Sequence, residues 1–303
     1  MTHKVGRKNY TPRNAARVHM AKVLSISSQV VYGHVGNSSA GFVLQRMGHD
    51  VLGLPTIILS NRPGYKHIAG ERSDPAMLHK MLEAILSNGW LDGVDAILTG
   101  YLPSSSHVEL CERWIAKVKG LNTNAVYLCD PIIGDDPSGI YLDEAAARSI
   151  RALLVPHADI LTPNCFELSW LSGRTISGGA SAVAAARSLS LPAVIVTSAP
   201  GNGPDTLANI LVEGDVACAT LSGRRTIHAH GTGDFFASNF LGHTLNGLSR
   251  QTSLRAATAA IELILEKSGG KTELSLIETQ AEWGASDPAL APLTTLPGIT
   301  VTP

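Results

Sequence analysis

The sequence is poor in charged and aromatic residues and contains no long hydrophobic run. Of 303 residues, 16% are charged and 5% are aromatic, and the formal net charge is -1. Such a balance creates no global field that would favour nucleic acid or an anionic membrane surface. No apolar run reaches the ~18 residues that a membrane-spanning helix needs. We therefore expect a small-molecule partner, and neither nucleic acid nor a membrane.

Cysteine is scarce, and no two cysteines form a metal-binding or redox pair. The four cysteines lie far apart in the sequence without a Cys-x-x-Cys motif, which favours buried reduced thiols over a zinc site or a disulfide framework. Residues 1–20 contain five Lys and Arg residues and no acid, and they lack the apolar centre of a signal peptide. We interpret them as a disordered basic arm, or as an over-long start upstream of Met20. These features predict a cytoplasmic protein.

What the chain does contain is a regular alternation of short β-rich runs and helical patterns. With 44% hydrophobic residues, it can bury one large core, and no linker divides it. We predict strands over 22–28, 50–59, 94–99, 125–129, 158–161 and 193–197. We predict helices over 37–47, 75–87, 104–119, 143–154, 180–189, 231–245 and 251–268. A further helix follows the strand at 158–161 and extends through Glu167.

This alternation predicts a three-layer α/β/α fold with a mostly parallel central sheet. The pattern changes at 209–221, where two runs around Glu213-Gly214-Asp215 predict an antiparallel hairpin at one edge. The tail from Glu282 is rich in Pro, Ala and Thr and is predicted to be irregular. The expected organisation is a single domain over 21–303 after the basic arm. In the helix over 75–87, one face is predicted to be apolar, with Met77, Leu78, Met81, Leu82 and Ile85.

In open parallel sheets, ligands bind beyond the carboxyl ends of the strands. Several polar residues lie at or just after the ends of predicted strands and are therefore candidates for a shared cleft: Ser27, Ser28, Tyr101, Asp130, Thr162, Asn164, Thr197 and Ser198.

The segment Gly231-Thr232-Gly233-Asp234 leads from a loop into a predicted helix. Glycines allow a tight backbone turn, and the first turn of a helix leaves its N–H groups unpaired and partly positive. This combination suits an anion such as a transferring phosphoryl group. A carboxylate at the same helix start can accept a proton from an attacking alcohol, which predicts Asp234 as a catalytic base. The alternative is that Asp234 merely caps the helix.

Two common designs for phosphoryl transfer are missing. The sequence has neither the Gly-x-x-x-x-Gly-Lys-Ser/Thr loop nor the protein-kinase glycine loop with His-Arg-Asp. Any kinase chemistry must use another design.

An ordered series of motifs between about Lys22 and Gly269 resembles the ribokinase superfamily and, within it, the pyridoxal kinase family. The matching stretches are SISS at 25–28, YGHVGN at 32–37, SNRPGY at 60–65, LTGY at 98–101, CDPIIGD at 129–135, DILTPNCFE at 159–167, TS at 197–198 and GTGD at 231–234. Several motifs in order are far more specific than any one of them. The stretches at 32–37 and 60–65 indicate pyridoxal kinase in particular.

The resemblance implies a ribokinase-like kinase that transfers the γ-phosphate of ATP to the 5′-hydroxymethyl group of pyridoxal. Asp234 would be the base, and the N–H groups from Gly231, Thr232 and Gly233 would hold the phosphoryl group. Asp130, Asp135 and Glu167 would position Mg²⁺, partly through water. Thr162, Asn164, Thr197, Ser198, Asp130 and Thr232 would contact the nucleotide. Ser28, Tyr101, Val35 and Asn61 would contact the vitamin, together with Asp234. A K⁺ ion and a homodimer are also implied.

Each of these residues also has a structural interpretation. Asp135 belongs to an Asp-Asp-Pro stretch that is typical of a turn, and Glu167 lies near a helix start, where an acid is favoured without a metal. The sequence differs from the family pattern at Gln29, Leu59 and Pro63, and these differences leave the preferred vitamer open. Two alternatives remain: a hydroxymethylpyrimidine kinase of the same superfamily, and a non-catalytic vitamin B6-binding protein.

Overall fold

The computed structural model describes residues 20–224 and 230–296, so the predicted arm over 1–20 lies almost wholly outside the described residues. A large sheet runs through the described part of the chain. Its ten strands follow one another in the order β12 (Leu293–Thr294), β11 (Val216–Gly223), β10 (Thr206–Glu213), β9 (Val194–Pro200), β8 (Ile160–Leu161), β5 (Val126–Cys129), β4 (Ala96–Thr99), β1 (Lys22–Tyr32), β2 (Asp50–Asn61) and β3 (Gly70–Arg72).

The centre of this sheet is parallel, as predicted. The pairs from β2 through β1, β4, β5 and β8 to β9 are all parallel, and β10, β11, β12 and β3 are antiparallel to their neighbours. Strand β4 has the sequence AILT and is buried along its whole length. Such short, apolar strands are typical of a sheet that helices cover on both faces.

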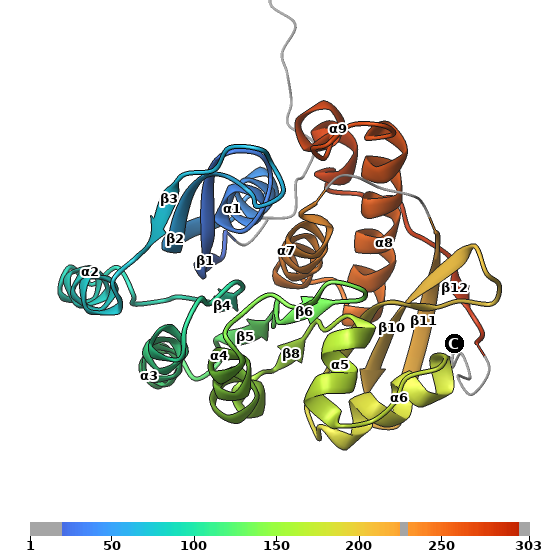
Figure 1. Ribbon diagram of the computed structural model, residues 1–303, viewed down its shortest axis with the longest axis horizontal. Helices are drawn as coiled ribbons and strands as arrows, with labels where there is room; N and C mark the ends of the chain where they lie inside the picture. The colour runs from blue at the N-terminus through green and yellow to red at the C-terminus, as the bar shows by residue number, and fades with distance from the viewer. Residues whose placement is uncertain (1–19, 225–229, 297–303) are drawn as a thin grey trace, which may run out of the picture.

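Helices cover both faces of the sheet (Figure 1). They are α1 (Asn37–Arg46), α2 (Pro75–Ser87), α3 (Ser105–Leu121), α4 (Glu144–Ser149), α5 (Cys165–Ser172), α6 (Gly179–Ser188), α7 (Thr232–Leu245), α8 (Arg250–Lys267) and α9 (Leu276–Trp283). One hydrophobic core joins the sheet to α2–α6, and a second joins it to α1 and α7–α9. The three-layer α/β/α prediction is confirmed. None of the helices in the described residues is long and apolar enough to cross a bilayer.

The predicted hairpin exists, but it does not form the edge of the sheet. Strands β10 and β11 pair in register from Thr206↔Gly223 to Glu213↔Val216, and the short β12 then adds beyond β11. The prediction of an irregular tail from Glu282 is therefore wrong at β12. Helix α9 and strand β3 also have no predicted counterpart. Short elements such as these carry too few residues for a clear periodicity.

The predicted apolar stripe of α2 is only half correct. Leu78 and Leu82 are fully buried, whereas Met77 is 45% and Met81 40% exposed. The predicted helix over 143–154 is α4 followed by a π-helical turn (Ile150–Leu154) and a 3₁₀ turn (Val155–His157). A small hairpin, β6 (Gly134–Asp135) with β7 (Gly139–Ile140), contains the predicted Asp-Asp-Pro turn.

Candidate active site

The carboxyl ends of the central strands meet the start of α7 in a narrow cavity. Ser25 and Ser27 of β1, Gly100 after β4, and Asp130 after β5 line it together with Asp234 of α7. The parallel-sheet rule therefore places the predicted base beside the strand ends. This arrangement meets the first requirement for the predicted chemistry.

The glycine loop before α7 approaches the backbone of another segment closely. Gly231, the N-cap residue, has φ 94°, and a Cβ there would lie 2.0 Å from the carbonyl oxygen of His34 and 3.3 Å from Cγ1 of Val35. Only glycine tolerates this position. No side chain of the described residues caps Gly231, so the first-turn N–H groups of α7 remain available to an anion.

Packing fixes the direction of α7. Phe235, next to the predicted base, is fully buried, and its ring lies 5.5 Å from the ring of Trp283 at an interplanar angle of 82°. Trp283 also packs edge-on against Phe42 of α1. A rigid start of the helix holds Asp234 toward the cavity.

Asp234 does not act as a simple helix cap. The backbone N–H of Gly36, in the turn between β1 and α1, donates a hydrogen bond to its carboxyl group. Burial raises the pKa of Asp234 to about 6, and the bond from Gly36 partly opposes this increase. A carboxyl group with a pKa near neutrality is well matched to proton transfer.

Asp130 is a second carboxyl group at the same place. It is buried, and Oγ1 of Thr162 donates to its Oδ1 over 3.1 Å. A Cβ on Gly233 would lie 3.9 Å from Oδ2 of Asp130, so this oxygen faces the first turn of α7. Burial raises the pKa of Asp130 well above its usual value, and the negative charges of Glu167 and Asp234 raise it further. Uncompensated carboxylates of this kind attract a cation.

Glu167 and Asn164 are tied to each other in a capping box at the start of α5. The Asn164 side chain accepts from the N–H of Glu167 over 2.9 Å, and the N–H of Asn164 donates to Oε2 of Glu167 over 2.9 Å. The N–H groups of Ile133 and Gly134 both donate to Oε1 of Glu167. Burial raises its pKa to about 7. Both oxygens already serve the fold, so Glu167 fits a metal only through water.

Asp135 has one carboxylate oxygen that the fold leaves unsatisfied. Its Oδ1 is buried without a hydrogen-bond partner in the described structure, and the hydroxyl of Tyr141 bonds to the side chain. No three acidic, histidine or cysteine groups of the described residues converge on one point. This donor set nevertheless fits Mg²⁺, which usually keeps several waters and uses only one or two carboxylates together with substrate phosphates.

The predicted nucleotide residues Thr197 and Ser198 lie in β9 beside the start of α5. The backbone of Thr197 bridges to Asn164, and its N–H donates to the carbonyl of Pro163 over 2.9 Å. Ser198 is exposed, with φ 55°, and its N–H donates to Oδ1 of Asn209 over 3.2 Å. A strained, exposed backbone within β9, beside the start of α5, is compatible with ligand contact.

The predicted vitamin contacts are only partly brought together. Ser28 lies against the turn, since a Cβ on Gly36 would be 2.2 Å from Oγ of Ser28, and Val35 faces Gly231. Tyr101 is anchored by its backbone, because its N–H donates to Oγ of Ser27 and its carbonyl accepts from Thr56. Its half-buried ring packs on the core.

Asn61 has mainly local contacts. Its Nδ2 donates to the carbonyls of Arg62 and His67, which closes the loop between β2 and β3. The structure does not place its side chain in the cavity that Asp234 lines. His230 is exposed, and His228 lies outside the described residues.

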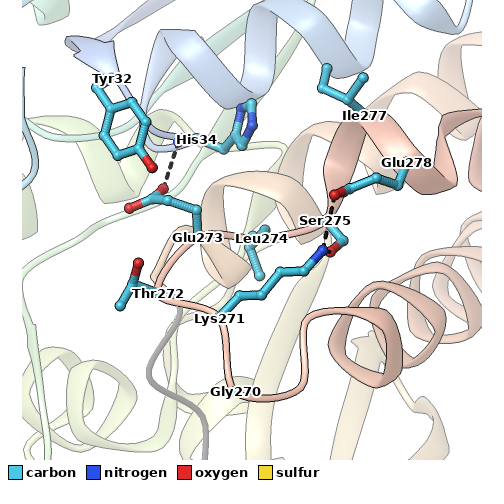
Figure 2. Close-up of a pocket in the computed structure, with 10 residues that line it drawn as sticks. All are labelled: Tyr32, His34, Gly270, Lys271, Thr272, Glu273, Leu274, Ser275, Ile277 and Glu278. Atoms are coloured by element: carbon cyan, nitrogen blue, oxygen red, sulfur yellow. Dashed lines mark hydrogen bonds and ion pairs between the residues drawn. The ribbon is translucent and has the colours of Figure 1, made fainter.

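A larger depression, of about 520 Å³, lies beside the Gly33–Gly36 turn (Figure 2). Tyr32 and His34 line one side, and the segment from Gly270 to Glu278 lines the other. It shares no lining residue with the cavity at Asp234. The smaller cavity fits the predicted chemistry better, because its acids, Asp130 and Asp234, lie beside the uncapped start of α7. The sequence analysis missed Glu273, the acid on the wall of this depression, since no sequence pattern links it to His34.

Comparisons with known proteins agree with this geometry. A family model described as "Phosphomethylpyrimidine kinase" matches residues 48–274. A "Pyridoxal kinase PdxY" from Leifsonia xyli subsp. xyli is 35% identical over 266 residues, covering 86% of this chain and 94% of that protein. A "Pyridoxine/pyridoxal/pyridoxamine kinase" from Bordetella avium is 36% identical over 241 residues, covering 78% and 81%. The pyridoxal kinase of Leishmania donovani, solved with ADP and pyridoxamine, has a TM-score of 0.83, 29% identity and coverage of 90% and 99%.

Fold and site together define the class of the protein: an ATP-dependent small-molecule kinase with the ribokinase-like fold. The alternative of a non-catalytic vitamin-binding protein is therefore not retained. Within that class, the chain belongs to the pyridoxal kinases, inside the phosphomethylpyrimidine kinase family.

Proposed function

We propose that this chain transfers the γ-phosphate of ATP to the 5′-hydroxymethyl group of pyridoxal, and that Asp234 is the base. One observation supports this most: a half-buried carboxyl group of raised pKa lies beside uncapped N–H groups at the carboxyl ends of a parallel sheet. Pyridoxine and pyridoxamine carry the same hydroxymethyl group and are candidate substrates, as the name of the Bordetella avium relative suggests.

The proposed reaction is a direct displacement. The substrate oxygen forms a bond to the γ-phosphorus while the bond from that phosphorus to the β–γ bridging oxygen breaks, and ADP leaves. Asp234 accepts the proton of the hydroxyl group as the oxygen attacks. The N–H groups of Gly231, Thr232 and Gly233 stabilise the charge on the transferring group because they are fixed at the helix start.

The nucleotide would extend from α7 toward Thr162, Asn164, Thr197 and Ser198. When Mg²⁺ is bound, it neutralises charge on the phosphates. Asp130 and Asp135 are the side chains best suited to hold it, with Glu167 acting through water. We retain K⁺ as a further proposed ligand on the family resemblance alone.

Ser28, Val35 and Tyr101 are proposed to contact the vitamin ring. Support comes from Ser28 and Val35, which lie against the glycines of the same turn and loop that hold Asp234. Asn61 is retained as a proposed contact, although its described contacts are with its own loop.

The same proposal covers the organisation of the chain. We propose one kinase domain over 21–303, because two cores share a single sheet. A homodimer is also proposed, and the exposure of Val31 (84%) and Tyr32 (60%) at the end of β1 supports it, since exposed apolar side chains mark contact surfaces. Sedimentation velocity tests this point. A cytoplasmic location remains part of the proposal.

The experiment that tests the function is phosphorylation of a substrate panel by the purified protein. The panel contains pyridoxal, pyridoxine, pyridoxamine, hydroxymethylpyrimidine and ribose, each with MgATP. We expect turnover of the B6 vitamers. The matching family is described as phosphomethylpyrimidine kinase, which supports a substituted pyrimidine as the second candidate substrate, and hydroxymethylpyrimidine represents that class in the panel. Preferential turnover of that compound or of ribose would refute the proposal.

A further inference from the structure

Three loops that are distant in sequence meet at the carboxylate of Glu273. Its Oε2 accepts a hydrogen bond from the backbone N–H of His34 over 3.2 Å, and Figure 2 shows the carboxylate pointing to the chain at that residue. Glu273 follows α8, and His34 lies in the turn between β1 and α1. The bond therefore joins the last third of the chain to the turn beside the active site.

The other oxygen of Glu273 is held by the loop between β2 and β3. The hydroxyl of Tyr65 donates to Oε1 over 2.7 Å, and Nε of Arg62 lies 3.4 Å from the same oxygen. The guanidinium group of Arg62 also stacks over the Tyr65 ring at 4.7 Å. The Arg62 and Glu273 side chains are only 9% and 14% exposed, so solvent screens this pair little.

The turn that Glu273 holds passes close to the Glu273 carboxylate, at a position that suits glycine. Gly33 has φ 108°, and a Cβ there would lie 2.7 Å from Oε2 of Glu273. Three residues further on, the N–H of Gly36 donates to the carboxyl group of Asp234. The carbonyl of His34 lies against the Cα of Gly231. The same turn thus contacts Glu273 on one side and both the base and the glycine loop on the other.

We propose that Glu273 is a positioning residue: it fixes the Gly33–Gly36 turn so that the N–H of Gly36 faces Asp234 and the start of α7 stays packed on His34. This inference rests on the proposed role of Asp234. Glu273 is not among the residues that line the cavity at Asp234, and its charge is not among the causes of the Asp234 pKa.

A Glu273 that only stabilises the fold would affect the pH profile differently from a Glu273 that positions the turn. If Glu273 only completes an ionic cluster, its loss lowers stability and leaves the acid limb of the pH profile in place. If it acts on Asp234 through its charge alone, removing that charge lowers the pKa of the base. If it acts through the turn, losing the Gly36 bond raises the pKa of the base. The sign of the shift separates the three cases.

Different charged groups surround Asp234 and Glu273. Asp234 faces the Asp130 carboxyl group, whose pKa it raises. Glu273 faces Arg62 and Tyr65, and its charge also acts on His34 and His230. Burial raises the pKa of Asp234 and the hydrogen bond from Gly36 lowers it, and the charge of Glu273 is not among the causes.

The test compares Glu273→Ala with Tyr65→Phe and with the control Glu278→Ala. Tyr65→Phe removes the donor to Oε1 but keeps the ring, so it preserves the test if Glu273→Ala fails to fold. Glu278 lines the same depression and pairs with Lys271 at the surface (Figure 2), so its loss removes a nearby acid without touching the turn.

Two readouts are measured for each variant: kcat/KM for pyridoxal against pH, and amide hydrogen exchange of the peptide covering 33–37. For Glu273→Ala we expect roughly a 10²-fold loss of kcat, as for a misplaced reacting group, and a KM for ATP near the wild-type value. The acid limb moves to higher pH, and exchange at 33–37 becomes at least ~10-fold faster, as expected when a local opening becomes easier. Tyr65→Phe shows smaller changes in the same directions, and the control shows none.

An acid limb that stays in place or moves to lower pH, or unchanged exchange at 33–37, overturns the inference. Hydrogen exchange does not depend on turnover, so it tests the turn even if the wild-type protein phosphorylates none of the panel. In that case the proposed function fails, and the exchange data alone decide whether Glu273 holds the turn.

Discussion

Replacing Asp234 by Asn removes a proton acceptor and little else. The amide has nearly the same shape, and its oxygen can still accept the hydrogen bond from the N–H of Gly36. The neighbouring glycine loop and the buried Phe235 are untouched. The substitution therefore separates chemistry from folding.

Two magnitudes follow from the structure. Loss of a general base typically lowers the rate by ~10² to 10⁴. The pKa of Asp234 is raised from a usual 3.8 to about 6, so the folded state resists ionisation of this group. Each tenfold change in proton affinity corresponds to about 1.4 kcal/mol. Keeping this carboxylate ionised at pH 7 therefore lowers the free energy of unfolding by at most ~3 kcal/mol. Because the stability that an acid with a raised pKa contributes is lost as pH rises, the neutral Asn variant should be more stable at pH 7.

The assay couples ADP release to NADH oxidation, with urea unfolding of the same preparations followed by circular dichroism. We expect Asp234→Asn to lose most turnover, to bind ATP as tightly as the wild type or more tightly, and to unfold at higher urea. Asp136→Asn, the same change at an exposed aspartate that does not line the cavity, serves as the control. A variant with wild-type kcat would refute the assignment and leave Asp234 as a structural residue.

Three further predictions concern the same site. The kcat/KM for pyridoxal should fall tenfold per pH unit below about pH 6 and be level above it, because only ionised Asp234 accepts a proton; a level profile down to pH 5 would contradict this. Gly231→Ala should lower stability by more than about 1 kcal/mol and reduce kcat, because its Cβ would meet the carbonyl of His34, whereas Gly247→Ala, with φ 88° and nothing within 4 Å, carries only the backbone strain. Asp135→Asn should raise the Mg²⁺ concentration for half-maximal activity, and exposed Asp136→Asn should not; equal metal dependence removes Asp135 from the proposed metal set.

Local patterns in the sequence predicted most of the elements and their order. Helix α2 was predicted with its observed bounds, and β1, α1, β2 and α7 differ by a few residues at their ends. The sequence also indicated that Asp234 follows a glycine loop at a helix start. These features depend on neighbours within a few positions of one another, which periodicity and turn chemistry report directly.

Tertiary structure decided which of these residues serve the fold and which face the cavity. It placed Glu167 and Asn164 in a reciprocal cap, exposed Met77 although its neighbours suggested burial, and added β12 to the sheet. It also joined Glu273 to His34, 239 positions apart. A residue's immediate neighbours limit its backbone conformation, but a contact between distant segments depends on how the whole chain packs, which no local pattern encodes.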